Sequence, residues 1–207
     1  CGDWLDTFTK FYADRNHAVP WKNLNAGWKD GGIDCKTCPF PGESTVPPGS
    51  TSTSPAYSIT SIRTERIPTH GLSATMATNN IKATLHQGKA VWFAYLLPNE
   101  DVWNDFRDFW SNHSEDIVYQ MDSADGTQYI FGKGGGGGHA VVIVGYDETD
   151  PNNRYWIALN SWGTANGLRP NGLFRIRMDM NYDCQNPGLA KGLPQGYGDY
   201  ALYFLTL

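Results

Sequence analysis

Hydrophobic side chains recur with a helical period at the start of the chain. The recurring positions are Trp4, Leu5, Phe8, Phe11 and Tyr12. They form one stripe of a 3.6-residue period, and Asp3 stands where its side chain can cap the first turn. The pattern therefore predicts a helix over residues 3–15.

The part of the chain that follows lacks such periodicity. Glycines and Pro39 punctuate residues 16–40, and residues 42–55 (GESTVPPGSTSTSP) are nearly free of hydrophobic side chains. Sequence of this composition is typical of an exposed loop. It does not indicate an interdomain linker, because patterned sequence resumes immediately after it.

The patterned sequence begins with one strand and one helix. Partial alternation of apolar and polar positions predicts a strand over residues 57–67. A short helix is expected over residues 78–87, closed by Gly88, because glycine readily adopts the left-handed conformation that ends helices.

A buried strand and a second helix come next. The apolar run at residues 90–97 ends at Pro98 and predicts a strand that is buried. Residues 101–110 then repeat the helical period. The apolar side of this helix is expected to consist of Val102, Phe106, Phe109 and Trp110.

Strand patterns dominate the rest of the chain. Five consecutive glycines, residues 134–138, precede them. Further strands are expected over residues 140–146, 155–160, 173–178 and 200–207. Because helices are few and strands follow one another without alternating helices, the sequence favours the α+β class.

Composition narrows the range of functions. The 207 residues are 40% hydrophobic and 14% aromatic, which excludes intrinsic disorder. The formal net charge is −5 and no cluster of Lys and Arg occurs, so we expect neither nucleic acid nor an anionic membrane surface as a partner. The longest apolar stretch is far shorter than the roughly 20 residues of a membrane span.

Four cysteines in a chain rich in Ser, Thr, Asn and Gly indicate a secreted or extracytoplasmic protein, and their even number permits two disulfides. The chain opens with Cys1 rather than Met, which predicts a processed or truncated end. Cys35 and Cys38 have no second ligand pair at a suitable spacing, so disulfide bonding to other cysteines is favoured over zinc or redox chemistry. We expect no metal and no cofactor.

His139 stands apart from the other four histidines, which lie in loops or on polar helix faces. It follows the glycine run and opens the most hydrophobic strand of the C-terminal half. An imidazole anchored on a rigid strand, with space above it, suits a general base or an ion-pair partner. On this feature alone, a structural histidine is an equally good interpretation.

Asn160 provides a second feature. It ends the return strand of a predicted hairpin, which would bring it beside His139. An asparagine oxygen can accept the imidazole N–H and define its tautomer without adding charge, so that the other ring nitrogen faces a nucleophile. The indole of Trp162 could then lie over the pair and exclude water.

Several blocks over residues 138–178 resemble the papain family of cysteine peptidases in order, spacing and residue types. They are Gly138-His139-Ala140-Val141, Val144-Gly145-Tyr146, Tyr155-Trp156, Asn160-Ser161-Trp162-Gly163 and Gly172-Leu173-Phe174-Arg175-Ile176. By this resemblance, His139 is the catalytic histidine, Asn160 orients it and Trp162 shields the pair. The resemblance also implies that Gly138 and Ala140 border the substrate cleft.

The family's nucleophile lies in a Cys-Gly-Ser/Ala-Cys-Trp/Tyr segment, with an upstream Gln for the oxyanion hole, and this chain has no such segment. Cys1-Gly2-Asp3-Trp4 resembles a later Cys-x-Gly-Gly segment of the family, which makes Cys1 structural and Gly2 a cleft residue. We therefore expect the nucleophile outside this chain, with Cys1 as an alternative nucleophile. Cys184 resembles a late family cysteine, but glycines replace its usual partner, so its pairing is open.

The resemblance implies one papain-like peptidase domain over residues 1–207. Residues 1–40 would be a remnant of the helical first lobe, residues 42–55 an exposed loop, and residues 56–207 an antiparallel, strand-rich lobe. Most of the chain is then the second lobe of the fold, with one helix of the first.

The expected function is hydrolysis of peptide or protein substrates by a Cys-His-Asn arrangement. The partner that this interpretation requires is an N-terminal segment, or a second chain, that carries the catalytic cysteine. Two alternatives are left open. One is a papain-like binding or adhesive protein that has lost its nucleophile. The other is an amidohydrolase in which Cys1 acts with its own α-amine as the base.

Overall fold

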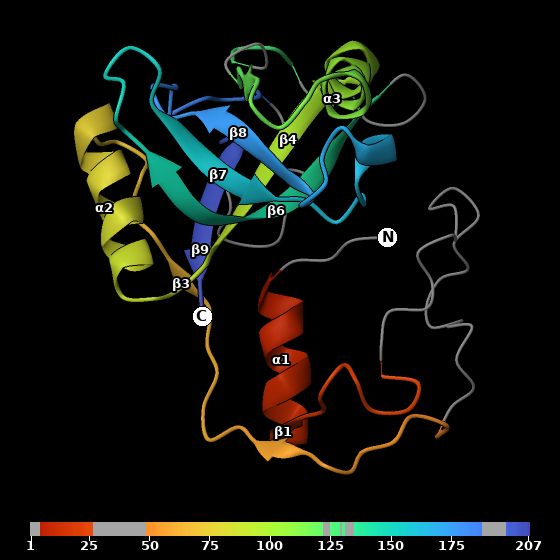
Figure 1. Cartoon of the computed structure of the whole chain (residues 1–207). Helices are drawn as coiled ribbons and strands as arrows, with labels where there is room; N and C mark the ends of the chain where they lie inside the picture. Colours follow the sequence, from red (N-terminus) through yellow and green to blue (C-terminus); the bar gives the residue numbers. More distant parts are fainter. Residues whose placement is uncertain (1–4, 27–48, 122–124, 129, 131–134, 188–197) are drawn as a thin grey trace. The chain divides into compact units, whose positions relative to one another are not determined.

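The computed structural model describes residues 5–26, 49–121, 125–128, 130, 135–187 and 198–207. The chain divides into two compact units, residues 1–64 and residues 65–207. The second unit thus begins at residue 65, whereas the sequence placed the start of the strand-rich part at residue 56. Both units are shown in Figure 1.

The described part of the first unit contains one helix, α1 (Leu5–Arg15), as the hydrophobic period predicts. Its two short strands, β1 (His17–Ala18) and β2 (Tyr57–Ser58), pair antiparallel. Leu5 is buried in α1, whereas Phe8 and Phe11 remain 45% and 46% exposed. The apolar stripe of this helix is therefore only partly covered within the described residues.

The second unit is built on a seven-stranded sheet. Its strands are β3 (Glu65–Arg66), β4 (Val91–Asn99), β5 (Val118–Tyr119), β6 (Gly135–Asp147), β7 (Tyr155–Leu159), β8 (Leu173–Arg177) and β9 (Leu202–Thr206). Their order across the sheet is β3-β9-β4-β6-β7-β8-β5. All neighbours are antiparallel except β5 and β8, which are parallel.

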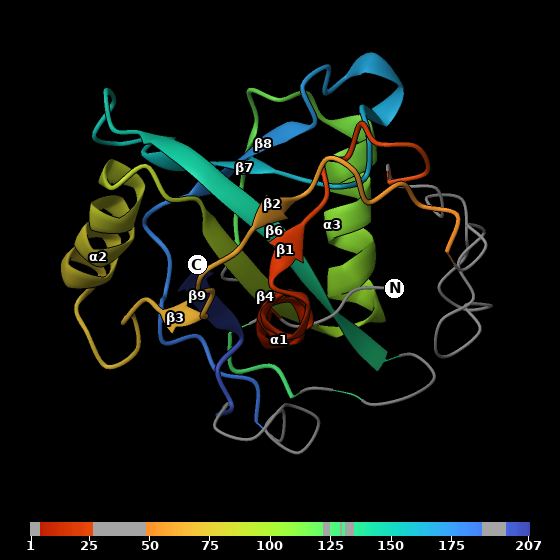
Figure 2. The same cartoon turned by 90° about the horizontal axis from the view of Figure 1, so that it is seen from below.

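Two helices flank this sheet, as Figures 1 and 2 show from two directions. They are α2 (Ala74–His86) and α3 (Glu100–Asn112), and both begin slightly earlier than their apolar periods predict. The reason is capping: the side chain of Ser73 accepts the N–H of Met76, and that of Asn99 accepts the N–H of Val102. Neither these helices nor α1 is long and apolar enough to cross a membrane.

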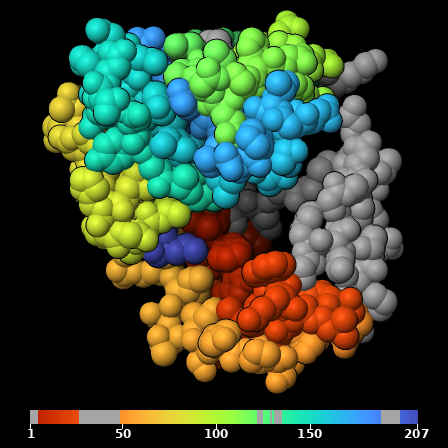
Figure 3. All heavy atoms as spheres, in the orientation of Figure 1, coloured from red at the N-terminus to blue at the C-terminus, as the bar shows by residue number. Residues whose placement is uncertain are grey.

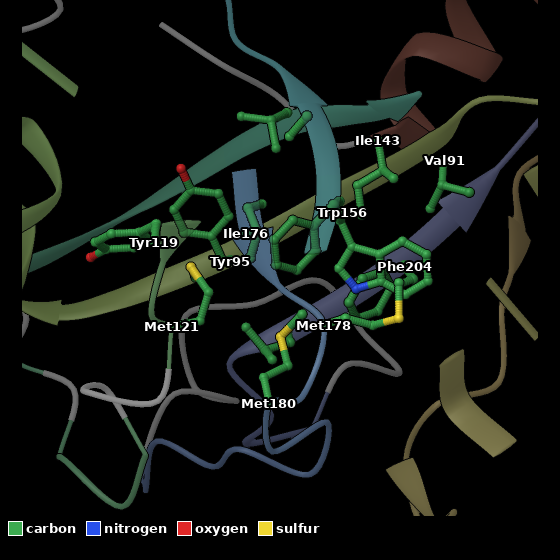
Figure 4. Close-up of a cluster of buried hydrophobic side chains, with 14 of the residues drawn as sticks. Val91, Tyr95, Tyr119, Met121, Ile143, Trp156, Ile176, Met178, Met180 and Phe204 are labelled. Atoms are coloured by element: carbon green, nitrogen blue, oxygen red, sulfur yellow. The ribbon is translucent and has the colours of Figure 1, made fainter. Parts of the chain in front are cut away.

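The core of the second unit is rich in aromatic side chains. Figure 4 shows Tyr95 and Tyr119 at one end of the cluster and Trp156 with Phe204 at the other. Within it the rings of Phe93 and Phe204 stack with centroids 4.6 Å apart. Strands supply most of these rings, and α3 and the turn that carries Tyr182 supply the others. Helices that pack on a largely antiparallel sheet confirm the predicted α+β class.

Three details of the sequence prediction are wrong. Residues 57–67 form two separate short strands in different sheets rather than one strand, because Ser58 pairs with β1 and Glu65 with β9. Pro98 lies inside β4 instead of ending it. His139 does not open its strand, since β6 begins at Gly135. The other strands agree with prediction to within about two residues, a normal uncertainty for element boundaries.

The glycines before His139 are part of the sheet because β4 comes very close to them. Gly135 and Gly138 pair with Asn99 and Leu96 of that strand. A Cβ atom on Gly136 would overlap the backbone oxygen of Leu97 and lie 2.6 Å from the carbonyl carbon of Pro98. Glycine is therefore required at this position by the approach of another backbone.

We expect Gly136→Ala to lower the free energy of unfolding by about 3 kcal/mol, because the new methyl group meets backbone atoms that cannot move aside. Gly137→Ala is the matched control, since its Cβ would lie 3.6 Å from the side chain of Trp103, an ordinary contact. Urea denaturation of both variants measures the difference. Equal destabilisation of the two would contradict the close approach of β4 and β6.

Candidate active site

The β6–β7 hairpin brings His139 and Asn160 together. In its register Val142 lies opposite Leu159, so the end of β7 stands beside the middle of β6, a few residues after His139. The imidazole Nε2 of His139 is 2.9 Å from the side-chain oxygen Oδ1 of Asn160. This contact confirms the predicted proximity of the two side chains, which are separated by 21 positions in the sequence.

A second hydrogen bond defines the orientation of the asparagine amide. The backbone N–H of Ser161 donates to Oδ1 of Asn160 at 2.8 Å. Flipping the amide would point its NH₂ group at this donor, so the atom that faces His139 is an oxygen, which can only accept. Nε2 of His139 must then carry the proton, and Nδ1 in the neutral ring is left as the basic nitrogen.

Asn160 is deeply buried, with 6% of its surface exposed. Its amide nitrogen Nδ2 is also buried and has no hydrogen-bond partner among the described residues. A buried donor without a partner is costly, so the two bonds to Oδ1 must outweigh that loss for the amide to stay in this orientation.

Aromatic rings surround the imidazole. The indole of Trp162 lies nearest, with ring centroids 4.5 Å apart and planes tilted by 40°. Three further rings, from β4 and α3, contact His139 at centroid distances of 5.5 to 6.3 Å: those of Tyr95, Phe106 and Trp103. These rings make the surroundings of the imidazole weakly polar, and the shielding role of Trp162 stays a prediction.

Burial controls the titration of His139. Removing the ring from water disfavours the imidazolium and lowers the pKa of His139 below its ordinary value of 6.5, while the hydrogen bond to Asn160 acts in the opposite direction. In the chain as described, His139 is therefore neutral at pH 7, with a basic Nδ1.

Two of the three predicted cleft residues, Gly138 and Ala140, lie in the described part of the chain. Gly138 is exposed and Ala140 is half-buried, and both flank His139 in β6. A Cβ on Gly138 would lie 3.1 Å from the side chain of Leu96, so this position also favours glycine. Gly2 lies outside the described residues.

Of the four cysteines, only Cys184 lies in the described part of the chain. It carries a buried thiol, 1% exposed, which hydrogen bonds to the carboxylate of Asp125. Cys1, Cys35 and Cys38 lie outside the described residues, so the disulfides predicted for Cys35 and Cys38 stay a prediction. In the part described, no three His, Cys, Asp or Glu side chains are arranged to hold a metal ion.

Sequence reasoning missed two elements of this site. Trp103 precedes Phe106 by three positions on the apolar face of α3, so its spacing could have placed it beside the site. Tyr95 lies opposite His139 in the sheet, but this pairing depends on the register of β4 with β6. No signal in the sequence specifies that register.

Part of the chain is similar in sequence to known cysteine peptidases. The family model described as papain family cysteine protease matches residues 117–190. The Cathepsin B-like cysteine proteinase 3 of Caenorhabditis elegans is 31% identical over 153 residues, which are 74% of this chain and 35% of that protein. Cysteine endopeptidase Rep1 of Oryza sativa subsp. japonica is 46% identical over 52 residues, or 25% of this chain and 14% of the relative.

Among solved structures, the bromelain protease from Ananas comosus in complex with the E64 inhibitor matches at 18% identity with a TM-score of 0.36. That match covers 69% of this chain and 47% of the bromelain chain. The matched parts span about a third or less of the two curated relatives. The resemblance to the papain family of cysteine peptidases is confirmed by the family model and these relatives.

Two substitutions of Asn160 should move the pKa of His139 in opposite directions. Asn160→Ala removes the hydrogen bond that raises this pKa, so the value should fall further. Asn160→Asp places a negative charge against the ring and should raise the pKa by about one unit or more. NMR titration of ring-labelled histidine measures both changes.

His70 is the internal control, because burial also lowers its pKa and it hydrogen bonds to the backbone of Leu202 instead of Asn160. Its titration should be unchanged in both variants. Parallel shifts of His70 and His139 would show that the substitutions act through general unfolding and not through the hydrogen bond.

The lowered pKa of His139 also makes stability depend on pH. Below about pH 6.5 the unfolded chain binds a proton at His139 more readily than the folded chain does. The free energy of unfolding should therefore fall as pH decreases from 6.5 towards the folded pKa, and then level off. His139→Gln should flatten this part of the stability–pH curve, and an unchanged curve would contradict the assignment.

Proposed function

We propose that this chain is the part of a papain-family cysteine peptidase that carries the catalytic histidine and asparagine. The observation that carries the proposal is the 2.9 Å contact between Nε2 of His139 and Oδ1 of Asn160 beneath the indole of Trp162. In this role His139 is the base and ion-pair partner, Asn160 orients it, and Trp162 excludes water from their hydrogen bond.

The chemistry follows from which ring nitrogen is available. Nε2 keeps its proton and donates it in the hydrogen bond to Asn160. Nδ1 therefore accepts the thiol proton, and the resulting imidazolium holds the thiolate in an ion pair. The thiolate attacks the peptide carbonyl carbon, and Nδ1–H then passes its proton to the leaving amine. A thioester results. Water, deprotonated by Nδ1, attacks the thioester, and the thiol and the new carboxyl group are released.

The nucleophile must come from another part of the protein. Cys184 is unsuitable, because its thiol is buried in the core and bonded to Asp125. We propose that the cysteine is supplied by a segment that precedes this sequence in a longer protein, or by a second chain. The small share of each relative that the chain matches is consistent with this arrangement.

The proposed substrates are peptides or proteins bound over the first part of β6, which pairs with β4 but extends beyond the end of β7. Gly138 and Ala140 flank His139 there, and their small side chains leave the neighbouring surface open. An open wall places few limits on the substrate side chain that it faces. We also retain, as a proposal from composition alone, that the protein is secreted or extracytoplasmic.

In the complete peptidase, His139→Ala should lower kcat/KM by roughly 10⁴-fold or more, because it removes the base and the ion-pair partner together. Asn160→Ala should cost about 10²-fold, since it misorients the imidazole without deleting it. Hydrolysis of a fluorogenic peptide measures both. His86→Ala is the control, because that histidine bonds to Tyr146 on an exposed surface.

Equal losses for His139→Ala and Asn160→Ala in folded protein would count against the two different roles. Full activity of His139→Ala would overturn the proposal and favour a papain-like binding protein or another catalytic arrangement.

The chain from Cys1 to Leu207 alone should not hydrolyse peptides, because a prepared base contributes only about 10²–10⁴-fold without a nucleophile. The purified chain, with its mass verified, is assayed with a fluorogenic peptide and a thiol-reactive epoxide. Epoxide-sensitive turnover with the label on Cys1 would make Cys1 the nucleophile. Turnover that also persists in His139→Ala would favour the amidohydrolase in which the α-amine of Cys1 is the base.

A further inference from the structure

The loop that follows Asn160 has a strained backbone. It runs over residues 161–172 and returns to β8, and its base is closed by the N–H of Asn160, which donates to the oxygen of Gly172 at 3.0 Å. Ala165 and Asn166 have φ angles of 45° and 54°, in the left-handed region that side chains disfavour. Such residues persist only where contacts with the surroundings hold the backbone in place.

Arg169 supplies such contacts from within this loop. The residue is completely buried, and its guanidinium donates three hydrogen bonds to backbone oxygens. Nε donates to Trp110 at 3.0 Å, Nη2 to Phe109 at 3.0 Å and Nη1 to Leu173 at 3.2 Å. Two of these acceptors lie in the last turn of α3, whose carbonyl groups carry partial negative charge. The oxygen of Phe109 also accepts the backbone N–H of His113 at 3.2 Å, so it is shared between the helix end and Arg169.

Further contacts hold the same loop. The guanidinium carbon of Arg169 lies 4.6 Å and 4.9 Å from the ring centroids of Phe109 and Trp110. In addition, Glu115 accepts the backbone N–H of Asn171 at 2.9 Å and that of Leu173, at the start of β8, at 3.3 Å. The loop is thus attached to α3 by a cation and to the segment after α3 by an anion.

The same helix receives Trp162 of this loop. The indole of Trp162 contacts the rings of Phe106 and Trp110 at centroid distances of 5.4 Å and 6.1 Å. Figure 3 shows the light-blue atoms of the loop against the green atoms of α3 on the visible face. A shift of the loop along α3 would therefore move Trp162 and also Ser161, whose N–H orients the amide of Asn160.

We propose that Arg169 is a positioning residue for the His139–Asn160 pair: by fixing the 161–172 loop on the end of α3, it keeps the N–H of Ser161 and the indole of Trp162 in place. The inference rests on the proposed function for its catalytic meaning. Independently of catalysis, Arg169 favours the His139 tautomer that carries its proton on Nε2, because it keeps the amide of Asn160 in the orientation that accepts this proton.

Arginine suits this position better than lysine. A planar guanidinium can donate in several directions at once, so it reaches carbonyl groups of both α3 and β8. A lysine ammonium keeps the charge but offers a single point of contact. Arg169→Lys should therefore restore only part of what Arg169→Met removes.

The test is NMR of the chain with nitrogen-labelled histidine at about pH 8, where the His139 ring is neutral. The ring nitrogen shifts report the ratio of the Nε2–H to the Nδ1–H tautomer. In Arg169→Met this ratio should fall by roughly threefold to tenfold, the effect of weakening one net hydrogen bond. In Arg169→Lys the fall should be smaller.

Arg175→Met is the matched control. Arg175 also donates to a backbone oxygen, that of Asp116, and also lies over an aromatic ring, that of Tyr155, but it does not contact the loop. Its tautomer ratio should equal that of the unsubstituted chain. A folded Arg169→Met protein with an unchanged ratio would overturn the inference, even if its melting temperature fell.

If Arg169→Met does not fold, Arg169→Lys and Glu115→Gln decide the question. Glu115→Gln keeps an oxygen acceptor for the loop but removes the charge, so it should lower the ratio modestly. Unchanged ratios in both folded variants would overturn the inference.

This readout needs no nucleophile and no substrate, so it separates the inference from the proposed function. In the complete peptidase, Arg169→Lys should lower kcat more than it changes KM. A changed tautomer ratio with normal kcat would leave Arg169 as a positioning residue and would count against catalysis by His139. An unchanged ratio would leave the proposed function standing without Arg169.

Discussion

The hydrogen bond from the imidazole of His139 to Oδ1 of Asn160 has to exist in an aromatic, largely water-free environment. A buried N–H or carbonyl oxygen that loses its partner costs about 1–3 kcal/mol, so both side chains are constrained to the one geometry that pairs them. The surrounding rings lower the pKa of His139, and the asparagine determines which ring nitrogen is basic. Burial and tautomer together produce a neutral imidazole with Nδ1 available for a proton.

The helix α3 connects the parts of this arrangement. Its apolar face places Trp103 and Phe106 against the ring of His139. Its last turn offers the backbone oxygens that bind Arg169, which lies in the loop that carries Trp162. One helix thus contributes both the low-polarity surroundings of the imidazole and the anchor for the residues that cover it. Substitutions far from His139 along α3 can therefore reach the site.

The glycines that precede His139 in β6 also help to position the aromatic rings around it, because they allow β4 to pair closely with β6. Without a side chain at Gly136, β4 can approach β6 closely enough to continue the pairing of the two strands as far as Asn99. That pairing sets Tyr95 opposite His139 and leads directly into α3, which begins at Glu100. The glycine run is thus part of the architecture that brings the aromatic face of α3 to the imidazole.

The sequence by itself determined the elements with strong periodicity, the α+β class and the proximity of His139 to Asn160. A short turn between two apolar strands sends the second strand back along the first, so its end was expected near His139. Family resemblance added the interpretation of that pair as catalytic, which stays a proposal. Tertiary structure alone decided that residues 57–67 are split between two sheets, since strand length there depends on which neighbour is available to pair.

The role of Arg169 was likewise a decision of the tertiary structure. In a sequence, a charged residue in a polar loop is typical of a solvated side chain, and its residue type carries no information about burial. Its guanidinium can be buried because the end of α3 presents two carbonyl oxygens and two aromatic rings at that position. Those acceptors reach the loop through the packing of a helix that lies some 60 residues earlier in the chain. No local sequence pattern predicts a contact between segments so far apart.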